Sequence, residues 1–419
     1  MMTYQILNPE TVVDYVKNLP ELNHYFSDFS TLEVEEIGDG NVNYVYRIKH
    51  PSSGKSIILK QAVPYLRIVG ESFPLSRERM NFEIMALTMA SQYSPTMVPQ
   101  IYHSSIEQSL VIMQDLVAHN IVRGEIIKGT VFPHFADHMS SYLAKNLFLT
   151  SDLALSSGAK KALVKQFINP DLCKLTEDFV FSHPYEAHET NVYNPELSQL
   201  TIDKVQKDRE VKIAVAQMKS KFINQAEALL HGDLHIGSIM ANVDETYVID
   251  PEFAFYGPMG FDVGALIGNL YMSYFSHAYE AHLKGEQSKA YRQWLLETIS
   301  AIWTQFSDKF QALWLTDEAA SDSLQWQYEN GRDDFKAYID TYMHSLLADT
   351  IGFAACKMMR RVIGLAKVAD FADIPDLTAR AAIESNIITM AAQMVVKRDQ
   401  YRSIEALNAL AVEIESQNK

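Results

Sequence analysis

Cysteine is scarce in this sequence. Only Cys173 and Cys356 occur among 419 residues, too few for the disulfide framework on which small secreted domains depend. The N-terminal stretch MMTYQILNPETVVDYV also lacks the basic segment and the apolar core of a secretory signal peptide. We therefore expect a protein of the reducing cytoplasm.

Long apolar runs and positive charge are in short supply as well. No run approaches the roughly 20 apolar residues that span a bilayer, so the sequence predicts no membrane segment. Lys and Arg number 36 against 52 Asp and Glu, which gives a formal net charge of -16. A surface of this charge repels nucleic acid and anionic membranes, and neither is expected as a partner. An anionic ligand needs a local cluster of cations.

What is present is an ordinary globular composition, with 47% hydrophobic and 21% charged residues. Alternating and β-branched segments separated by Gly, Asn and Pro turns occur early in the chain, and helical periodicity dominates later, except near residues 229–256. We predict an α+β fold of two lobes. A small β-rich N-terminal lobe covers residues 1–113, a hinge covers 114–118, and a large, mostly helical C-terminal lobe covers 119–419.

The stretch EIGDGNVNYVYRI, residues 36–48, places glycines in a turn between two strands. A dinucleotide-binding fingerprint needs its glycines at the start of a helix, whereas a glycine-rich hairpin over phosphates is typical of kinases. Asn43 stands at the third glycine position, and Asn tolerates positive φ. We expect Gly38, Gly40, Asn41 and Asn43 to line an ATP phosphate site. An ordinary hairpin turn is the alternative.

Lys60 ends the apolar strand SIILK. A buried ammonium without an anionic partner is costly, so we expect it to meet a nucleotide phosphate and a carboxylate from the following helix. Glu83 in SRERMNFEIMAL fits the apolar face of that helix better than Glu78 does. The alternative is a lysine that reaches water along its apolar stem.

The stretch HGDLHIGSIM alternates His231, Asp233 and His235. Imidazole and carboxylate groups both bind zinc, but no further His or Cys cluster stands nearby. The favoured interpretation makes Asp233 the group that accepts a hydroxyl proton, on an irregular loop that follows a helix, with the two histidines shaping that loop. A purely structural polar loop is the third possibility.

Two carboxylates, Asp250 and Glu252, follow the strand-like segment TYVID. Carboxylates at the end of a strand can both face one hard cation, and Mg²⁺ prefers such oxygen ligands. An exposed acidic turn is the alternative. Further along, Asp262 is a candidate N-cap of the next helix and is placed to anchor the loop that carries Asp233.

The order of these features is the phosphoryl-transfer layout of the protein-kinase-like fold. HGDLH followed by DPE resembles the aminoglycoside phosphotransferase and choline kinase branch of small-molecule kinases. More narrowly, VGESFPLSRER, HGDLHIGSIM and VIDPEFAFYGPMGFDVG resemble the methylthioribose kinase family of methionine salvage. The resemblance covers essentially the whole chain.

This resemblance implies ATP and Mg²⁺ as cofactors, a homodimer, and phosphorylation of the anomeric hydroxyl of S-methyl-5-thioribose to the 1-phosphate, with ADP as the other product. It assigns Asp233 as the catalytic residue, which also binds the sugar, and Asp250 and Glu252 as metal ligands that hold ATP–Mg²⁺ together with Lys60. Ser238 stands where protein kinases carry a metal-binding Asn. The second carboxylate of DPE then replaces the lost amide oxygen.

The resemblance also implies contacts for adenine and sugar. Adenine would bond backbone groups around Gln114 and Leu116, while Arg360 and Arg361 in MMRRVIGLAKVADF would reach the sugar and the transferring phosphoryl group. Neighbouring helix residues point about 100° apart, so only one of these arginines can fully face a buried site. Surface salt bridges are the alternative for both. Phe73 occupies the place of a tryptophan in a substrate-closing loop of the relatives.

Other functions remain open at this level. A kinase of choline, homoserine or an aminoglycoside would share the motifs around ATP, although choline calls for an aromatic cage and the arginine pair suits a neutral or anionic acceptor. A catalytically dead nucleotide-binding scaffold is disfavoured because the lysine and the three carboxylates named above are all present. A metal-dependent hydrolase built on His231, Asp233 and His235 is the remaining alternative.

Overall fold

The structure of the chain is a computed structural model that describes residues 4–26, 28–37, 42–67, 70–316 and 331–417. The strands are β1 Glu33–Glu36, β2 Tyr44–Lys49, β3 Ser56–Gln61, β4 Tyr65–Leu66, β5 Gly70–Pro74, β6 Ile101–Ser105, β7 Leu110–Gln114, β8 Asn120–Ile121, β9 Ala228–Leu230, β10 Ile239–Ala241, β11 Thr246–Val248 and β12 Phe255–Gly257. The helices are α1 Pro9–Lys17, α2 Arg79–Tyr93, α3 Val122–Lys128, α4 Phe135–Leu149, α5 Ser157–Gln166, α6 Pro170–Phe181, α7 Gln199–Gln206, α8 Arg209–Asn224, α9 Gly260–Ala278, α10 Gly285–Trp314, α11 Gly331–Ile363, α12 Ala369–Ala372, α13 Leu377–Lys397 and α14 Ile404–Gln417. Short 3-10 turns cover Pro20–Leu22, His183–Tyr185 and Arg398–Gln400.

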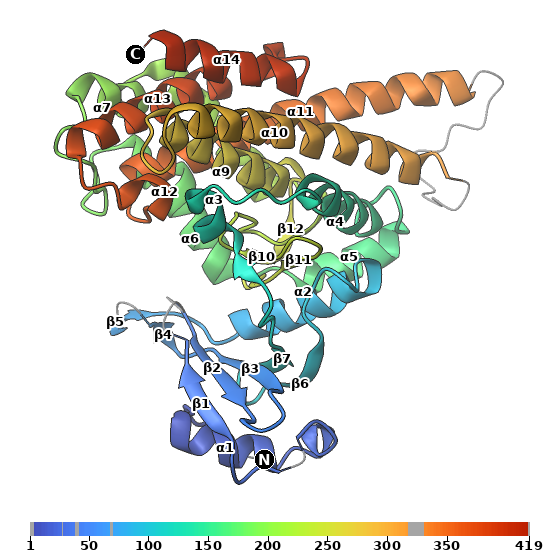
Figure 1. The fold of residues 1–419 in the computed structure, drawn as a ribbon. Helices are drawn as coiled ribbons and strands as arrows, with labels where there is room; N and C mark the ends of the chain where they lie inside the picture. The colour runs from blue at the N-terminus through green and yellow to red at the C-terminus, as the bar shows by residue number, and fades with distance from the viewer. Residues whose placement is uncertain (1–3, 27, 38–41, 68–69, 317–330, 418–419) are drawn as a thin grey trace.

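The N-terminal lobe is built on a five-stranded antiparallel sheet in the order β1-β2-β3-β7-β6 (Figure 1). Because successive side chains of a strand point to opposite faces, Leu59 of β3 joins the core beneath α1, with Val12 and Val16. Its neighbour Lys60 therefore faces the opposite side, where Met80 of α2 packs on the sheet. The alternation of β3 thus directs one cation toward α2.

Two small sheets of the C-terminal lobe position the loops that carry the candidate residues. β10 pairs with β11 and with β8, and β9 pairs with β12. The segment before HGDLH is therefore strand β9, and our expectation that this loop follows a helix is wrong, since α8 already ends at Asn224. A three-residue apolar run has no periodicity that separates helix from strand, and the partner of β9 lies far along the chain.

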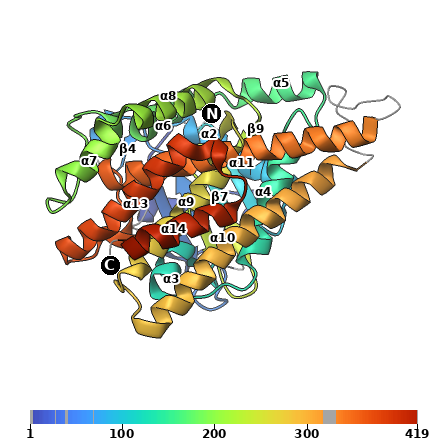
Figure 2. The same ribbon diagram turned by 90° about the horizontal axis from the view of Figure 1, so that it is seen from above.

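The rest of the C-terminal lobe is helical and is organised around α9, whose residues are all buried. α11 packs along α9 and α13, and α10 packs along α4 (Figure 2). Close approach of α9 and α11 depends on a glycine, because a Cβ atom on Gly264 would lie 2.5 Å from the carbonyl oxygen of Thr350. This contact sets the position of α11, which carries the arginine pair in its last turn.

The two-lobed α+β fold, with a small β-rich N-terminal lobe and a large helical C-terminal lobe, is confirmed. The β4–β5 hairpin was not anticipated. Asp262 is the third residue of α9 and not its N-cap, a position that Met259 occupies. The chain leaves β7 at Gln114 and enters β8 at Asn120. None of the helices in the described residues has the length and apolar character that a membrane crossing requires.

Candidate active site

Lys60 is paired with acidic groups from both lobes. Its Nζ lies 2.9 Å from Oε1 and 2.8 Å from Oε2 of Glu83, while Glu78 is exposed at the start of α2. Asp250 contacts the same ammonium from the C-terminal lobe. Burial opposes the charge on Lys60, but the surrounding carboxylates raise the pKa of its ammonium above the ordinary value. The lysine is therefore held in its charged form.

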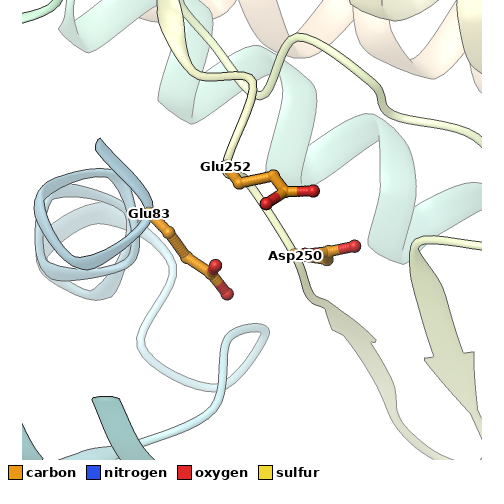
Figure 3. A group of neighbouring side chains, drawn as sticks. All are labelled: Glu83, Asp250 and Glu252. Carbon is orange, nitrogen blue, oxygen red and sulfur yellow. The ribbon is translucent and has the colours of Figure 1, made fainter. Parts of the chain in front are cut away.

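Three carboxylates lie near one another around this lysine, and Figure 3 shows their side chains. Glu83 reaches in from α2, and Asp250 and Glu252 come from the loop that follows β11. One oxygen of each lies within 4.8 Å of the others, and among the described residues no other three His, Cys, Asp or Glu side chains meet in this way. Burial raises the pKa of Glu83 and of Glu252. Hard oxygen ligands at this spacing fit Mg²⁺.

The loop that carries these two carboxylates is anchored in the C-terminal lobe. Asp250 has a φ of 66°, in the left-handed region that few non-glycine residues adopt. Asn169, which is buried just before α6, donates from Nδ2 to the carbonyl oxygens of Glu252 at 2.9 Å and Ala254 at 3.1 Å. Strained backbone of this kind persists only where its surroundings over-determine it. The loop is thus built to present its carboxylates toward α2.

Glu252 also belongs to a buried network that links it to the N-terminal lobe. Asn43 donates from Nδ2 to Oε2 of Glu252 at 2.8 Å, and its Oδ1 accepts from Nε and Nη2 of Arg79 at 3.1 and 2.8 Å. Arg79 is 2% exposed. Asn43 is absent from the described non-glycine residues with positive φ, so our expectation that it replaces a glycine through left-handed backbone is wrong. Its side-chain amide, not its backbone, makes the contacts.

The remaining predicted ATP-binding residues lie in the glycine-rich turn and in the link between the lobes. Outside the described residues lie Gly38, Gly40 and Asn41. Gln114 uses its backbone N–H to bond the carbonyl oxygen of Gln100 at 2.8 Å. Leu116 is buried, and in the described part of the chain its backbone N–H has no hydrogen-bond acceptor. Of the two link residues, Leu116 therefore has the free donor.

The HGDLH loop is held by Asp262 and by a close backbone contact. The carboxylate of Asp262 accepts from the backbone N–H groups of His231 at 2.6 Å and Gly232 at 3.0 Å, which is the anchor expected from the sequence. Gly232 has a φ of 84°, and a Cβ atom there would overlap the carbonyl oxygen of Phe253. Only glycine fits this position. The loop is thereby pressed against the segment that carries the metal-ligand candidates.

The two histidines of the loop have different surroundings. Nε2 of His231 lies 2.8 Å from the carbonyl oxygen of Ile249. Nδ1 of His235 accepts from the N–H of Gly237 at 3.0 Å, so Nε2 carries the ring proton and lies 3.4 Å from Oδ2 of Asp233. Burial lowers the pKa of His235 to about 4, and the ring is neutral at neutral pH. The histidines shape the loop and do not form a three-ligand group with Asp233.

Asp233 is surrounded by cations. Lys357 donates from Nζ to Oδ1 at 2.8 Å, and Nη2 of Arg360 lies 3.8 Å from the same oxygen. Burial alone would raise the pKa of Asp233, but Lys357 and His235 hold it well below its usual range. Ser238 donates from Oγ to the backbone carbonyl oxygen of Asp233 at 3.0 Å. Its hydroxyl therefore stabilises the loop.

Of the predicted substrate-binding residues, the structure brings Arg360 to Asp233. Arg360 and Arg361 are both buried, so the alternative of surface salt bridges is wrong. Arg361 donates from Nη1 to the carbonyl oxygen of Ala366 at 3.2 Å. Phe73 is half-buried on β5 and, in the described part of the chain, makes no ring contact with an arginine or another aromatic side chain.

Sequence reasoning missed Lys357 and Arg79. The spacing of Lys357, Arg360 and Arg361 is i, i+3 and i+4, which places three cations on one face of a helix and could have indicated an anion site. Arg79 belongs to the quoted motif VGESFPLSRER, but nothing local shows that it is buried. Its partners, Asn43 and Glu252, are contributed by distant segments.

The site has two electrostatic halves. Around Lys60, carboxylates gather that can hold a divalent cation together with a polyphosphate. Around Asp233, cations gather that can stabilise a group of negative charge while the carboxylate orients a hydroxyl. The arrangement is suited to transfer of a phosphoryl group, in which positioning and electrostatic stabilisation supply most of the catalysis.

Comparison with known proteins places the chain among phosphotransferases. The model of the phosphotransferase enzyme family matches residues 182–314. Methylthioribose kinase 1 of Oryza sativa subsp. japonica is 40% identical over 405 residues, 96% of this chain and 94% of that protein. Methylthioribose kinase of Bacillus cereus is 38% identical over 411 residues, 98% of this chain and 97% of that protein. A solved ethanolamine kinase of Plasmodium vivax is 13% identical, with a TM-score of 0.44 and coverage of 100% of this chain and 90% of that one.

Proposed function

Because the chain belongs to the methylthioribose kinase family, we propose that it transfers the γ-phosphoryl group of ATP to the anomeric hydroxyl of S-methyl-5-thioribose. The products are ADP and S-methyl-5-thioribose 1-phosphate, in a step of methionine salvage. The observation that carries the proposal is the pairing of a half-buried carboxylate, Asp233, with the buried cations Lys357 and Arg360. A hydroxyl acceptor and an incoming phosphoryl group need these two kinds of partner together.

On the nucleotide side, Lys60 binds ATP phosphates and Glu83 holds the lysine in place, as in the kinase arrangement. The phosphates are also assigned to the glycine-rich sequence at residues 38–43, of which residues 38–41 lie outside the described part of the chain. Leu116, whose backbone N–H is free in the described part of the chain, donates to adenine. Residues 114–118 act as the hinge between the lobe of residues 1–113 and the lobe of residues 119–419.

Mg²⁺ is bound by Asp250 and Glu252. Support comes from the carboxylate group itself, whose oxygens lie within 4.8 Å of one another, and from the short, anchored loop that presents them. When bound, Mg²⁺ neutralises charge on the phosphates. The hydroxyl of Ser238 donates to the loop backbone. The carboxylate of Glu252 therefore serves as the metal ligand that an Asn provides in protein kinases.

On the acceptor side, Asp233 orients the anomeric hydroxyl and accepts its proton. A carboxylate with a pKa held well below its usual range is a weak base toward an alcohol. Proton transfer therefore comes late, after bond formation to phosphorus has made the hydroxyl acidic, which agrees with a loose transition state. Arg360 has its buried Nε without a partner among the described residues, and this guanidinium is available to the transferring group.

An ADP-release assay with methylthioribose, choline, homoserine and kanamycin as acceptors tests the proposal. We expect turnover with methylthioribose and none above background with the other three. A response to choline alone would overturn the specific assignment and leave the phosphotransferase chemistry in place. Phosphorus NMR of the product distinguishes a 1-phosphate from phosphorylation at another hydroxyl.

The protein acts in the cytoplasm as a homodimer. The family resemblance supports a dimer. Light scattering on a size-exclusion column should give twice the chain mass of 47.5 kDa. A single-chain mass at micromolar concentration would contradict it.

A further inference from the structure

Lys357 is a buried cation whose role the motifs do not state. It lies on α11 one turn before the arginine pair, and its side chain is 4% exposed. Its Nζ lies 2.8 Å from Oδ1 of Asp233 and 4.5 Å from the centre of the Phe261 ring. The ammonium is therefore fixed between an aromatic face of α9 and the carboxylate of the HGDLH loop.

A buried ammonium needs compensation, and Asp233 supplies it. In the described part of the chain, Asp233 is the one hydrogen-bond acceptor of Lys357. The contact also has an orientation: Lys357 and Arg360 both approach Oδ1, whereas among the described residues the side chain that approaches Oδ2 is the neutral ring of His235, at 3.4 Å. One oxygen of the carboxylate is bound by two cations, and the other, which faces the N–H of His235, keeps a lone pair for a further partner.

We propose that Lys357 is the positioning residue of Asp233. Its ammonium binds Oδ1, which keeps the carboxylate ionised and leaves Oδ2 turned toward the acceptor hydroxyl. The proposal rests on the proposed function and deepens it, since it assigns the two oxygens of Asp233 different tasks. No bond is made or broken at Lys357.

The charged and titratable groups that face Lys357 give the expected pH dependence. They are Asp233 from the HGDLH loop, Asp262 from α9, and Arg360 and Arg361 from its own helix, while His235 contacts the other oxygen of Asp233. Without Lys357, the strongest of the charges that lower the pKa of Asp233 is lost and that pKa rises, so the acid limb of activity moves to higher pH. Burial lowers the pKa of Lys357 itself to about 8, so wild-type activity falls as pH rises through that value.

The test compares Lys357→Met, which keeps the apolar stem, with Lys357→Arg, which keeps the charge. Lys357→Met should lower kcat by about tenfold to a hundredfold, leave the KM for ATP within about twofold of wild type, and move the acid limb of kcat upward. Lys357→Arg should keep more of kcat and shift the alkaline limb to higher pH, because a guanidinium stays charged. Lys221→Met is the matched control. Lys221 of α8 pairs at 2.5 Å with Asp349 of α11, and Asp349 lies about two turns before Lys357 on that helix.

A second measurement does not depend on the acceptor. In protein labelled with ¹³C at the Asp carboxyl groups, the Asp233 resonance is assigned by its loss in Asp233→Asn and followed against pH. It should titrate at a clearly higher pH in Lys357→Met than in wild type and in Lys221→Met. An unchanged titration, or an equal loss of kcat in the Lys221→Met control, would overturn the role of Lys357. Absence of wild-type turnover with methylthioribose would instead overturn the proposed function, and the NMR result would still decide for Lys357.

Discussion

At the scale of single residues, charge is arranged in two opposite ways. Lys60 is a cation among carboxylates, and Asp233 is a carboxylate among cations. Each charged centre is kept ionised in spite of burial, because its neighbours carry the opposite sign. Phosphoryl transfer needs this pair of environments, one for the metal-bound nucleotide and one for the acceptor and the transferring group.

Replacement of the acceptor-side carboxylate tests this division. Asp233→Asn should lower kcat by about 10²–10⁴-fold, the usual contribution of a positioned acid–base group. Binding of ATP–Mg²⁺ should persist, because no contact of Asp233 reaches the carboxylates around Lys60. Calorimetry of nucleotide binding and steady-state kinetics check the two halves. Retention of most activity would remove Asp233 from the mechanism.

The Arg79–Asn43–Glu252 network makes a separate prediction about stability. Asn43→Ala leaves two donors of Arg79 and one oxygen of Glu252 buried without their partner, which costs about 1–3 kcal/mol for each unsatisfied group. The free energy of unfolding from urea titration should fall accordingly. In the control Asn224→Ala, an exposed amide loses one bond to a helix carbonyl, and the value should change little.

At the scale of elements, the proposed acceptor site depends on how closely α11 approaches α9. Gly264 faces the backbone of α11, where an added Cβ atom would lie 2.5 Å from an oxygen and 2.8 Å from the nitrogen of Ala354. Neither atom can move without the whole helix. Since α11 carries Lys357 and Arg360, the spacing of two helices sets the position of the cations at Asp233.

Gly264→Ala should therefore lower both the melting temperature and kcat, although alanine favours a helix more than glycine does. The matched control is Gly158→Ala in α5, where an added Cβ atom has nothing within 4 Å. That variant should leave kcat unchanged and keep or raise the melting temperature. Differential scanning fluorimetry and kinetics on both variants check this prediction. Equal changes of kcat and melting temperature in the two variants would mean that the spacing of α9 and α11 does not control activity.

At the scale of the whole molecule, the proposed nucleotide site is shared between the lobes. Lys60 and Glu83 belong to the N-terminal lobe, and Asp250 and Glu252 to the C-terminal lobe. A ligand that binds both sets stabilises the folded chain by mass action, by about 2.7 kcal/mol at a hundredfold excess over its Kd. The two lobes should therefore unfold together at a higher temperature when ATP–Mg²⁺ is bound.

Chelation of Mg²⁺ distinguishes the contribution of the metal to this stabilisation from that of the nucleotide. With EDTA present, ATP should give little stabilisation and no turnover, and added Mg²⁺ should restore both. In Glu252→Gln, more Mg²⁺ should be needed for half-maximal activity, because one carboxylate ligand is lost. Thermal unfolding and ADP release over a Mg²⁺ titration provide the measurements. Full activity in EDTA would exclude the metal role of Asp250 and Glu252.

Much of the fold and site followed from local pattern. Alternating segments predicted β1 and β2, and a β-branched, apolar segment predicted β3. The lysine that ends this buried strand predicted an anionic partner, because burial of a charge is costly in any fold. Asp233 stood out because it alternates with two histidines, and Asp250 and Glu252 stood out because they follow an apolar strand-like segment. The pairing of β9 with β12 was not predicted, because a strand of three residues is too short to show the alternation of apolar and polar residues.

The sequence by itself determined the residue types, their order along the chain, and the chemistry that this order permits. Tertiary structure alone decided which side chains meet. Lys357 and Asp233 are 124 residues apart, and their contact exists because α11 packs against a glycine of α9. Asn43 and Glu252 are 209 residues apart, and they meet where the two lobes close on each other. Periodicity acts over a few residues, whereas contacts of this separation arise only when whole elements pack.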